Sequence, residues 1–145
     1  IGEKIGITKF ERIEAEYVAS YIHGANRIGV LVGLNKEAAG SGKDIAMQIA
    51  ASNPSWVRRE DVPADLLEKE RSIYMIQARE SGKPEHVLDK IVEGKVEKFY
   101  VDTCLLEQSF IKDPSVTINE IIQQKIAKIG ENISVKRFTR YQLGG

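Results

Sequence analysis

Two stretches near the start of the chain have the apolar pattern of β-strands. Glu16–Ile22 and Arg27–Leu34 are joined by His23–Asn26, which contains Gly and Asn, two residues that tolerate positive φ. This arrangement predicts a β-hairpin. Because Arg27–Leu34 is almost continuously apolar, we expect it to be the central strand of a sheet. Gly29 and Gly33 should let another element pack closely over it.

The two ends of the chain resemble each other in sequence. Ile1–Arg12 can be laid over Ile129–Arg140 with Ile, Gly, Glu, Ile, Phe and Arg recurring in register. Both copies then alternate apolar and polar positions, as at Ile5 and Ile7 or at Ile133 and Val135, which is the period of a half-buried strand. We therefore expect two similar strands in one sheet, each entered through an Ile-Gly turn.

The middle of the chain has the apolar spacing of two helices. Ala64–Ser81 and Pro84–Leu106 are separated only by a short connection that contains Gly82. A glycine that ends one helix and a proline that begins the next favour an antiparallel helical hairpin. Each arm would be roughly 27–30 Å long at 1.5 Å per residue. We expect a hairpin of this length to protrude.

Shorter helices are predicted on either side of this hairpin. Asp44–Ser52 has an apolar stripe and ends before a proline-containing loop, Asn53–Pro63, which we expect Trp56 to anchor to the core. The second short helix is Ile118–Lys128. Thr117 should be its N-cap, with a Glu three positions later completing a capping box.

These elements together predict an α+β fold. We expect a small antiparallel sheet of three to four strands packed on helices, with a protruding antiparallel helical hairpin. The 145 residues suit a single domain, in which residues 64–106 form the hairpin subdomain.

Charge and composition predict that the partner is neither a nucleic acid nor a membrane. Lys+Arg and Asp+Glu both number 21, so the net charge is zero, and proteins that bind nucleic acid or anionic membranes usually carry a basic excess. No apolar run approaches the ~18–20 residues of a membrane span.

A single cysteine, Cys104, excludes an intrachain disulfide. We expect a bacterial cytoplasmic protein, with an organelle interior as the alternative, and a fragment or processed form because the chain begins at Ile1.

The motif that most resembles a catalytic or ligand site is Gly40-Ser41-Gly42-Lys43, directly before a predicted helix. Backbone N–H groups in such a place can cradle phosphate. A Walker A motif, however, requires Gly where this chain has Glu37 and a hydroxyl residue where it has Asp44. We therefore expect a Gly/Ser loop with Asp44 as the N-cap. An enzyme that uses this loop on a phosphorylated ligand remains the alternative.

The remaining reactive residue types form no evident site. A zinc site needs about four ligands, whereas this chain has two histidines, His23 and His86, and one distant cysteine. Cys104 is most simply a small buried hydrophobe. We expect no metal, no cofactor and no catalytic residue, so that the protein is not an enzyme.

Six segments, in this order along the chain, resemble the elongation factor Ts family. The first looks like the signature strand of that family, and it is the occurrence of all six in the family's order that makes the resemblance specific. They are His23–Val32, Asp44–Pro54, Ser81–Pro84, Ile91–Lys95, Leu105–Phe110 and Lys128–Ile133.

The resemblance implies a role in translation elongation. Members of this family act as guanine nucleotide exchange factor for the GTPase elongation factor Tu, and they have two related core halves and a helical hairpin used in dimerisation. By resemblance, this chain contains the second core half and the hairpin, binds Tu and forms a homodimer. The family's Thr-Asp-Phe-Val stretch and its N-terminal ubiquitin-associated-like domain are not among these residues. A pure dimerisation module without Tu contact is the other alternative.

The resemblance also implies which residues contact Tu. Gly2 and His23 match Tu-contacting positions of this core half, and Phe110, Ile111 and Lys112 match a loop that approaches the outer domain of Tu. Simpler readings are that Gly2 is only a turn residue and that His23 is only a side chain of the hairpin loop.

Overall fold

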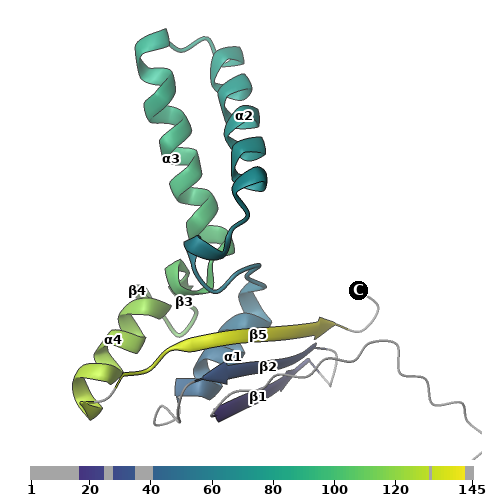
Figure 1. The fold of residues 1–145 in the computed structure, drawn as a ribbon, viewed down its shortest axis with the longest axis vertical. Coiled ribbons are helices and arrows are strands. Elements are labelled where there is room, and N and C mark those ends of the chain that lie inside the picture. Colours follow the sequence, from purple (N-terminus) through teal and green to yellow (C-terminus); the bar gives the residue numbers. More distant parts are fainter. Residues whose placement is uncertain (1–16, 25–27, 35–40, 131, 143–145) are drawn as a thin grey trace, which may run out of the picture.

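The computed structural model describes residues 17–24, 28–34, 41–130 and 132–142. Figure 1 shows a body made of a sheet and helices, from which a pair of long helices projects. The elements follow in this order: β1 Tyr17–His23, β2 Ile28–Leu34, α1 Ser41–Ser52, the 3-10 helix η1 Arg59–Asp61, α2 Ala64–Glu80, α3 Glu85–Thr103, the 3-10 helix η2 Leu105–Glu107, β3 Ser109–Phe110, β4 Asp113–Thr117, α4 Ile118–Ile129 and β5 Val135–Gln142.

The main sheet is antiparallel, with the strand order β1-β2-β5. This confirms the α+β class, the predicted pairing of the first two strands and the central place of β2. The strand predicted from the C-terminal repeat exists, but it begins at Val135, two residues after Ile133. Its expected counterpart in Ile1–Arg12 lies outside the described residues.

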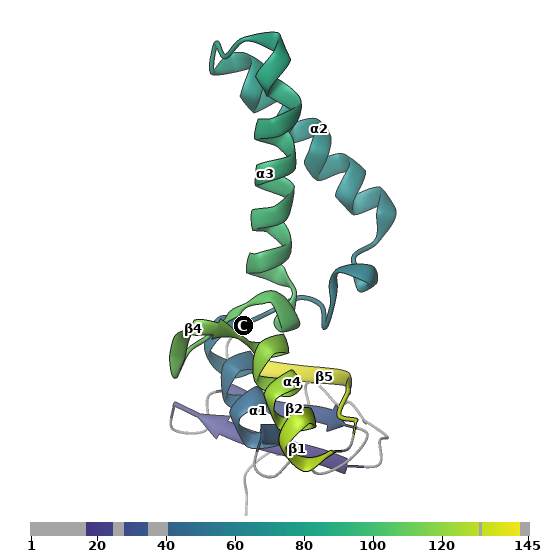
Figure 2. The ribbon, with the colours of Figure 1, turned by 90° about the vertical axis from the view of Figure 1, so that its left-hand side faces the viewer.

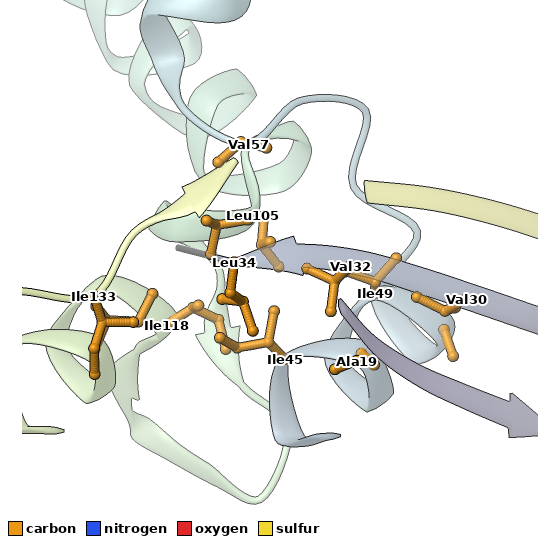
Figure 3. Close-up of a cluster of buried hydrophobic side chains, with 14 of the residues drawn as sticks. Ala19, Val30, Val32, Leu34, Ile45, Ile49, Val57, Leu105, Ile118 and Ile133 are labelled. Atoms are coloured by element: carbon orange, nitrogen blue, oxygen red, sulfur yellow. The ribbon is translucent and has the colours of Figure 1, made fainter. Parts of the chain in front are cut away.

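The core of the body lies on the face of the sheet that α1 covers (Figure 3). Val30, Val32 and Leu34 alternate along β2 and are at most 2% exposed. Their period of two places them on one face, where the apolar side of α1 meets them. Residues distant in sequence complete this cluster: Ala19, Ile45, Ala46, Ile49, Ala50, Val57, Leu105, Phe110, Ile118, Ile122, Ile133 and Val135.

The two long helices, α2 and α3, form the predicted antiparallel hairpin. Gly82, with φ of 75°, follows the end of α2 in the left-handed region, and Pro84 is the N-cap of α3. A separate buried cluster joins the two arms: Ala78, Leu88, Val92 and Val96. Figure 2 shows α3 rising directly from the body. Helix α2 is close to α3 at the tip of the hairpin and diverges from α3 towards Ala64, where α2 begins.

Helix α3 is shorter than predicted. It ends at Thr103, because Cys104 has extended backbone angles and the next three residues form η2. The N-cap of α4 is confirmed in detail, since Thr117 and Glu120 make both halves of a capping box.

Three further expectations are corrected. Helix α1 begins at Ser41, so Asp44 lies within its first turn instead of capping it. A Cβ placed on Gly29 would meet no heavy atom of the described chain within 4 Å, so none of the described elements packs closely over Gly29. The half-buried Trp56 ring lies against Phe99 of α3, with ring centroids 6.1 Å apart, and it is Val57 that enters the core of the body. The Trp56 carbonyl also accepts from Leu105 N at 2.8 Å.

The short ladder of β3 and β4 was not expected from the sequence. Ser109 pairs with Thr117 and Phe110 with Asp113, so the chain reverses within a tight turn before α4. This turn places residues of the candidate site on the surface of α1.

Candidate partner-binding surface

The structure places the proposed contact residues in two parts of the body. His23 is the last residue of β1, paired with Ile28 of β2, so it ends a strand rather than lying in the connecting loop. The same end of the sheet holds Gln142, the partner of Ile28 on β5. Gly2 lies outside the described residues.

The other three candidates form the turn between β3 and β4. Phe110 is only 8% exposed and belongs to the core of the body, whereas Ile111 is 42% exposed. Lys112 is exposed, and its Nζ lies 2.9 Å from Oδ1 of Asp44 on α1. Phe110 therefore fastens the turn to the core, and Ile111 and Lys112 present an apolar and a cationic side chain to solvent.

A buried glutamine of α1 holds this turn in place. Gln48 is 0% exposed, and its Nε2 donates to the Ser109 carbonyl at 3.0 Å. Its Oε1 accepts from the backbone N of Ile111 at 2.9 Å. Gln48 was not predicted as a functional residue. The one available signal was a polar residue between Ile45 and Ile49, inside an otherwise apolar stripe.

The far side of the turn is ordered by its own side chains. Asp113 Oδ1 accepts from the Ser115 hydroxyl at 2.6 Å and from the Ser115 backbone N at 3.2 Å. These bonds, the hydroxyl bond first, lower the pKa of the Asp113 carboxyl below its ordinary value. The carboxylate therefore stays charged near neutral pH and keeps the turn closed.

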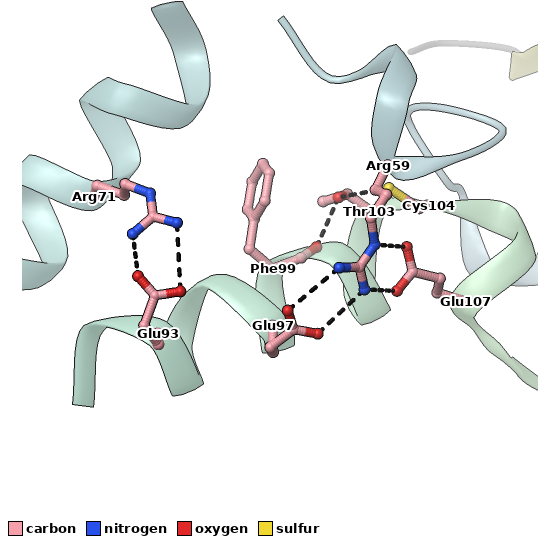
Figure 4. Close-up of polar contacts among 8 residues, drawn as sticks. All are labelled: Arg59, Arg71, Glu93, Glu97, Phe99, Thr103, Cys104 and Glu107. Atoms are coloured by element: carbon pink, nitrogen blue, oxygen red, sulfur yellow. Dashed lines mark hydrogen bonds and ion pairs between the residues drawn. The ribbon is translucent and has the colours of Figure 1, made fainter. Parts of the chain in front are cut away.

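A second polar cluster fixes the root of the hairpin. Arg59 donates to Glu107 through Nε and Nη2, and to Glu97 of α3 through Nη1 at 3.3 Å and Nη2 at 3.1 Å (Figure 4). The guanidinium carbon also lies 4.4 Å from the centre of the Tyr100 ring. The loop after α1 is thereby tied to α3 beside the body.

The described geometry gives no support to a phosphate-binding loop at residues 40–43. Ser41, Gly42 and Lys43 form the first turn of α1, and the carboxylate of Asp44 in the same turn is paired with Lys112. Gly40 lies outside the described residues.

Other reactive chemistry is also sparse. In the described part of the chain, no three His, Cys, Asp or Glu side chains gather as metal ligands would. Cys104 is 0% exposed, as expected for a small buried hydrophobe, and burial raises the pKa of its thiol. None of the described helices is both long and apolar enough to cross a membrane.

Comparison with known proteins agrees with the resemblance seen in the sequence. The family described as Elongation factor TS matches residues 1–145. Proteins named elongation factor Ts from Carboxydothermus hydrogenoformans, Heliobacterium modesticaldum and Desulforamulus reducens are similar to this chain, at 51%, 52% and 53% identity over 94% of it. The chain spans 67–68% of the length of these relatives. Together with the predicted order of strands and helices, these matches show that the chain belongs to the elongation factor Ts family of translation elongation factors.

Proposed function

We propose that this chain binds elongation factor Tu and acts as part of its guanine nucleotide exchange factor in the bacterial cytoplasm. Family membership over the full 145 residues supports the partner. The observation that carries the placement is the β3–β4 turn, where exposed Ile111 and Lys112 stand on a backbone that buried groups hold fixed. A preordered apolar and cationic pair loses little conformational entropy on binding.

Exchange in this proposal is thermodynamic linkage and requires no reactive side chain. A factor that binds nucleotide-free Tu more tightly than nucleotide-bound Tu must weaken nucleotide binding by the same factor. The contribution of this chain is binding energy from the body. Because the Thr-Asp-Phe-Val stretch of the family is not among these residues, we expect the 145 residues by themselves to accelerate GDP release poorly.

Self-association is the second part of the proposal, and it concerns the hairpin. Ile73 and Ile76 on α2 are 39% and 54% exposed, and Val101 on α3 is 43% exposed. Ile73 and Ile76 are three residues apart and so share a face of α2, and adjoining exposed apolar side chains of this kind are typical of protein contact surfaces. Binding to Tu by the body and self-association by the hairpin would then use different surfaces.

The experiment is a titration of the chain with nucleotide-free Tu by calorimetry, for the wild type, Ile111→Ala and Lys112→Ala. We expect each substitution to weaken binding by about 1–2 kcal/mol, the size of an ordinary interface contact. Ile129→Ala is the matched control, because Ile129 is 37% exposed on α4, away from the turn. Equal losses for Ile111→Ala and Ile129→Ala would remove the turn from the interface. If the wild type does not bind Tu, the alternative of a dimerisation module without Tu contact would be favoured.

A further inference from the structure

The side-chain amide of Gln48 bonds to the β3–β4 turn as a neighbouring strand would. In an extended strand, the carbonyl of one residue and the N–H two residues later point to the same side. At the turn these groups are the Ser109 carbonyl and the Ile111 N–H, and Gln48 bonds both, at 3.0 Å and 2.9 Å. A side chain from α1 therefore replaces one step of a β-ladder, around Phe110.

Further bonds fix the orientation of this amide. Its Nε2 also donates to Ser52 Oγ at 2.9 Å and lies 3.4 Å from Oε1 of Gln108. Gln108 in turn donates to the Asp102 carbonyl at 3.0 Å, so its Oε1 is left facing Gln48 as an acceptor. The Ser109 carbonyl and Oε1 of Gln108 can only accept, so the amide atom of Gln48 that faces them must be the NH₂ nitrogen. The other amide atom is then the carbonyl oxygen, which accepts from the Ile111 N–H.

We propose that Gln48 is a positioning residue for Tu binding, which fixes the backbone of residues 109–111 so that Phe110 points into the core and Ile111 points outward. The inference rests on the proposed function, because it concerns the presentation of the same turn. Gln48 is 0% exposed and its two bonds to the turn are partly buried, so losing them would remove hydrogen bonds that water replaces only in part. The turn would then sample other conformations.

Two substitutions test separately the hydrogen-bond donor of the Gln48 side chain and the volume of that side chain. Gln48→Glu keeps an acceptor for the Ile111 N–H but sets a carboxylate against the Ser109 carbonyl and Oε1 of Gln108. Gln48→Met keeps a similar length and volume but can make neither strong bond. Gln124→Glu on the exposed face of α4 is the control for the added charge.

The test measures two quantities on the full chain: exchange of the Ile111 amide hydrogen, and affinity for nucleotide-free Tu. For Gln48→Met we expect the Ile111 amide to exchange about tenfold faster, which corresponds to losing one partly buried hydrogen bond, while amides of β2 keep their rates. Affinity should also fall about tenfold. Gln48→Glu should show both effects more strongly, and Gln124→Glu neither.

A double variant distinguishes positioning from a general loss of stability. If Gln48 acts through the turn, Gln48→Met should cost less affinity when Ile111→Ala is already present. The inference is overturned if Ile111 and β2 amides speed up together, if the Ile111 amide does not respond, or if both losses of affinity simply add. If Gln48→Glu fails to fold, the Met variant decides alone. Failure of the proposed function has another signature, in which the Ile111 amide responds but neither Gln48→Met nor Ile111→Ala changes Tu binding.

Discussion

The body and the hairpin are stabilised by contacts of different kinds. The core of the body joins segments far apart in sequence, with Leu34, Ile49 and Leu105 all at 0% exposure in one cluster. The core of the hairpin is a single row along two adjacent helices, of which Val92 and Val96 are members. Stability in the body is therefore shared among distant segments, whereas the hairpin depends on a few neighbouring side chains.

This difference implies two cooperative units within one chain. Local opening draws on regions with few buried apolar contacts, and such regions can open without global unfolding. The hairpin should open first, and the body should keep its fold when it does.

Removing buried methyl groups should distinguish the two units most clearly. Ile49→Ala should destabilise the body by about 2–5 kcal/mol and accelerate exchange at amides of both units. Val96→Ala should cost about 2 kcal/mol, the transfer of two methyl groups plus a small cavity, and accelerate exchange only in α2 and α3. Hydrogen exchange resolved by residue checks both. Uniform acceleration by Val96→Ala would show a single cooperative unit.

Substitutions in the body and in the hairpin should affect different binding reactions, namely Tu binding and self-association. His23→Ala should weaken association with nucleotide-free Tu by about 1–2 kcal/mol, the size of an ordinary interface contact, and we expect the thermal midpoint to stay unchanged. Ile76→Ala, at a residue 54% exposed on α2, should instead weaken self-association and spare Tu binding. Calorimetry and sedimentation measure the two affinities. A lowered midpoint with unchanged affinity would make His23 structural.

The link between the units is weaker than either core. Arg59→Ala should cost about 1 kcal/mol, because it removes a bidentate pair and a ring contact from a guanidinium that is 40% exposed. Amides of η1 and the root of α3 should exchange faster. Arg71→Ala is the matched control, because Arg71 pairs with Glu93 within the hairpin and away from the root. A larger loss for Arg71→Ala would place the main electrostatic support inside the hairpin.

The smallest effect is a pH dependence at the junction of α3 and the body. Burial raises the pKa of Cys104 in the folded chain, so above the ordinary thiol value of about 8.5 the unfolded state loses its proton first. The folded state then binds more protons, and stability falls as pH rises through this window. Thermal melts between about pH 8 and about pH 9.5 should show a slope that Cys104→Ala reduces. An unchanged slope would assign it to other groups.

Local signals made the helical hairpin and the α4 cap predictable from sequence. Gly82 and the proline after it mark the turn between α2 and α3, and Thr117 with Glu120 marks the start of α4. The β1–β2 pairing is similar, since its period of two and its connection lie within a short window. In each case the residues that decide the structure are neighbours in sequence.

The features that sequence reasoning missed depend on distant residues. The β3–β4 turn has no alternating apolar run of its own, and it is ordered by Gln48, about sixty positions earlier. The local pattern offers one hint only, that Gln48 lies between Ile45 and Ile49 in an otherwise apolar stripe, and it does not indicate what Gln48 binds. Helix α1 also begins before its apolar stripe, at a buried Ser41, so periodicity placed its start three residues late.

The chain enters and leaves the hairpin at almost the same point. Trp56 N donates to the Thr103 carbonyl at 3.1 Å, and Leu105 N donates to the Trp56 carbonyl at 2.8 Å, which makes a short parallel bridge at the base. In topological terms, the hairpin is one long excursion of the chain whose two ends meet at this bridge. Whole helical turns could be added to or removed from both arms without moving the flanking backbone. The reach of the hairpin can therefore diverge between species while the body beneath it stays constant.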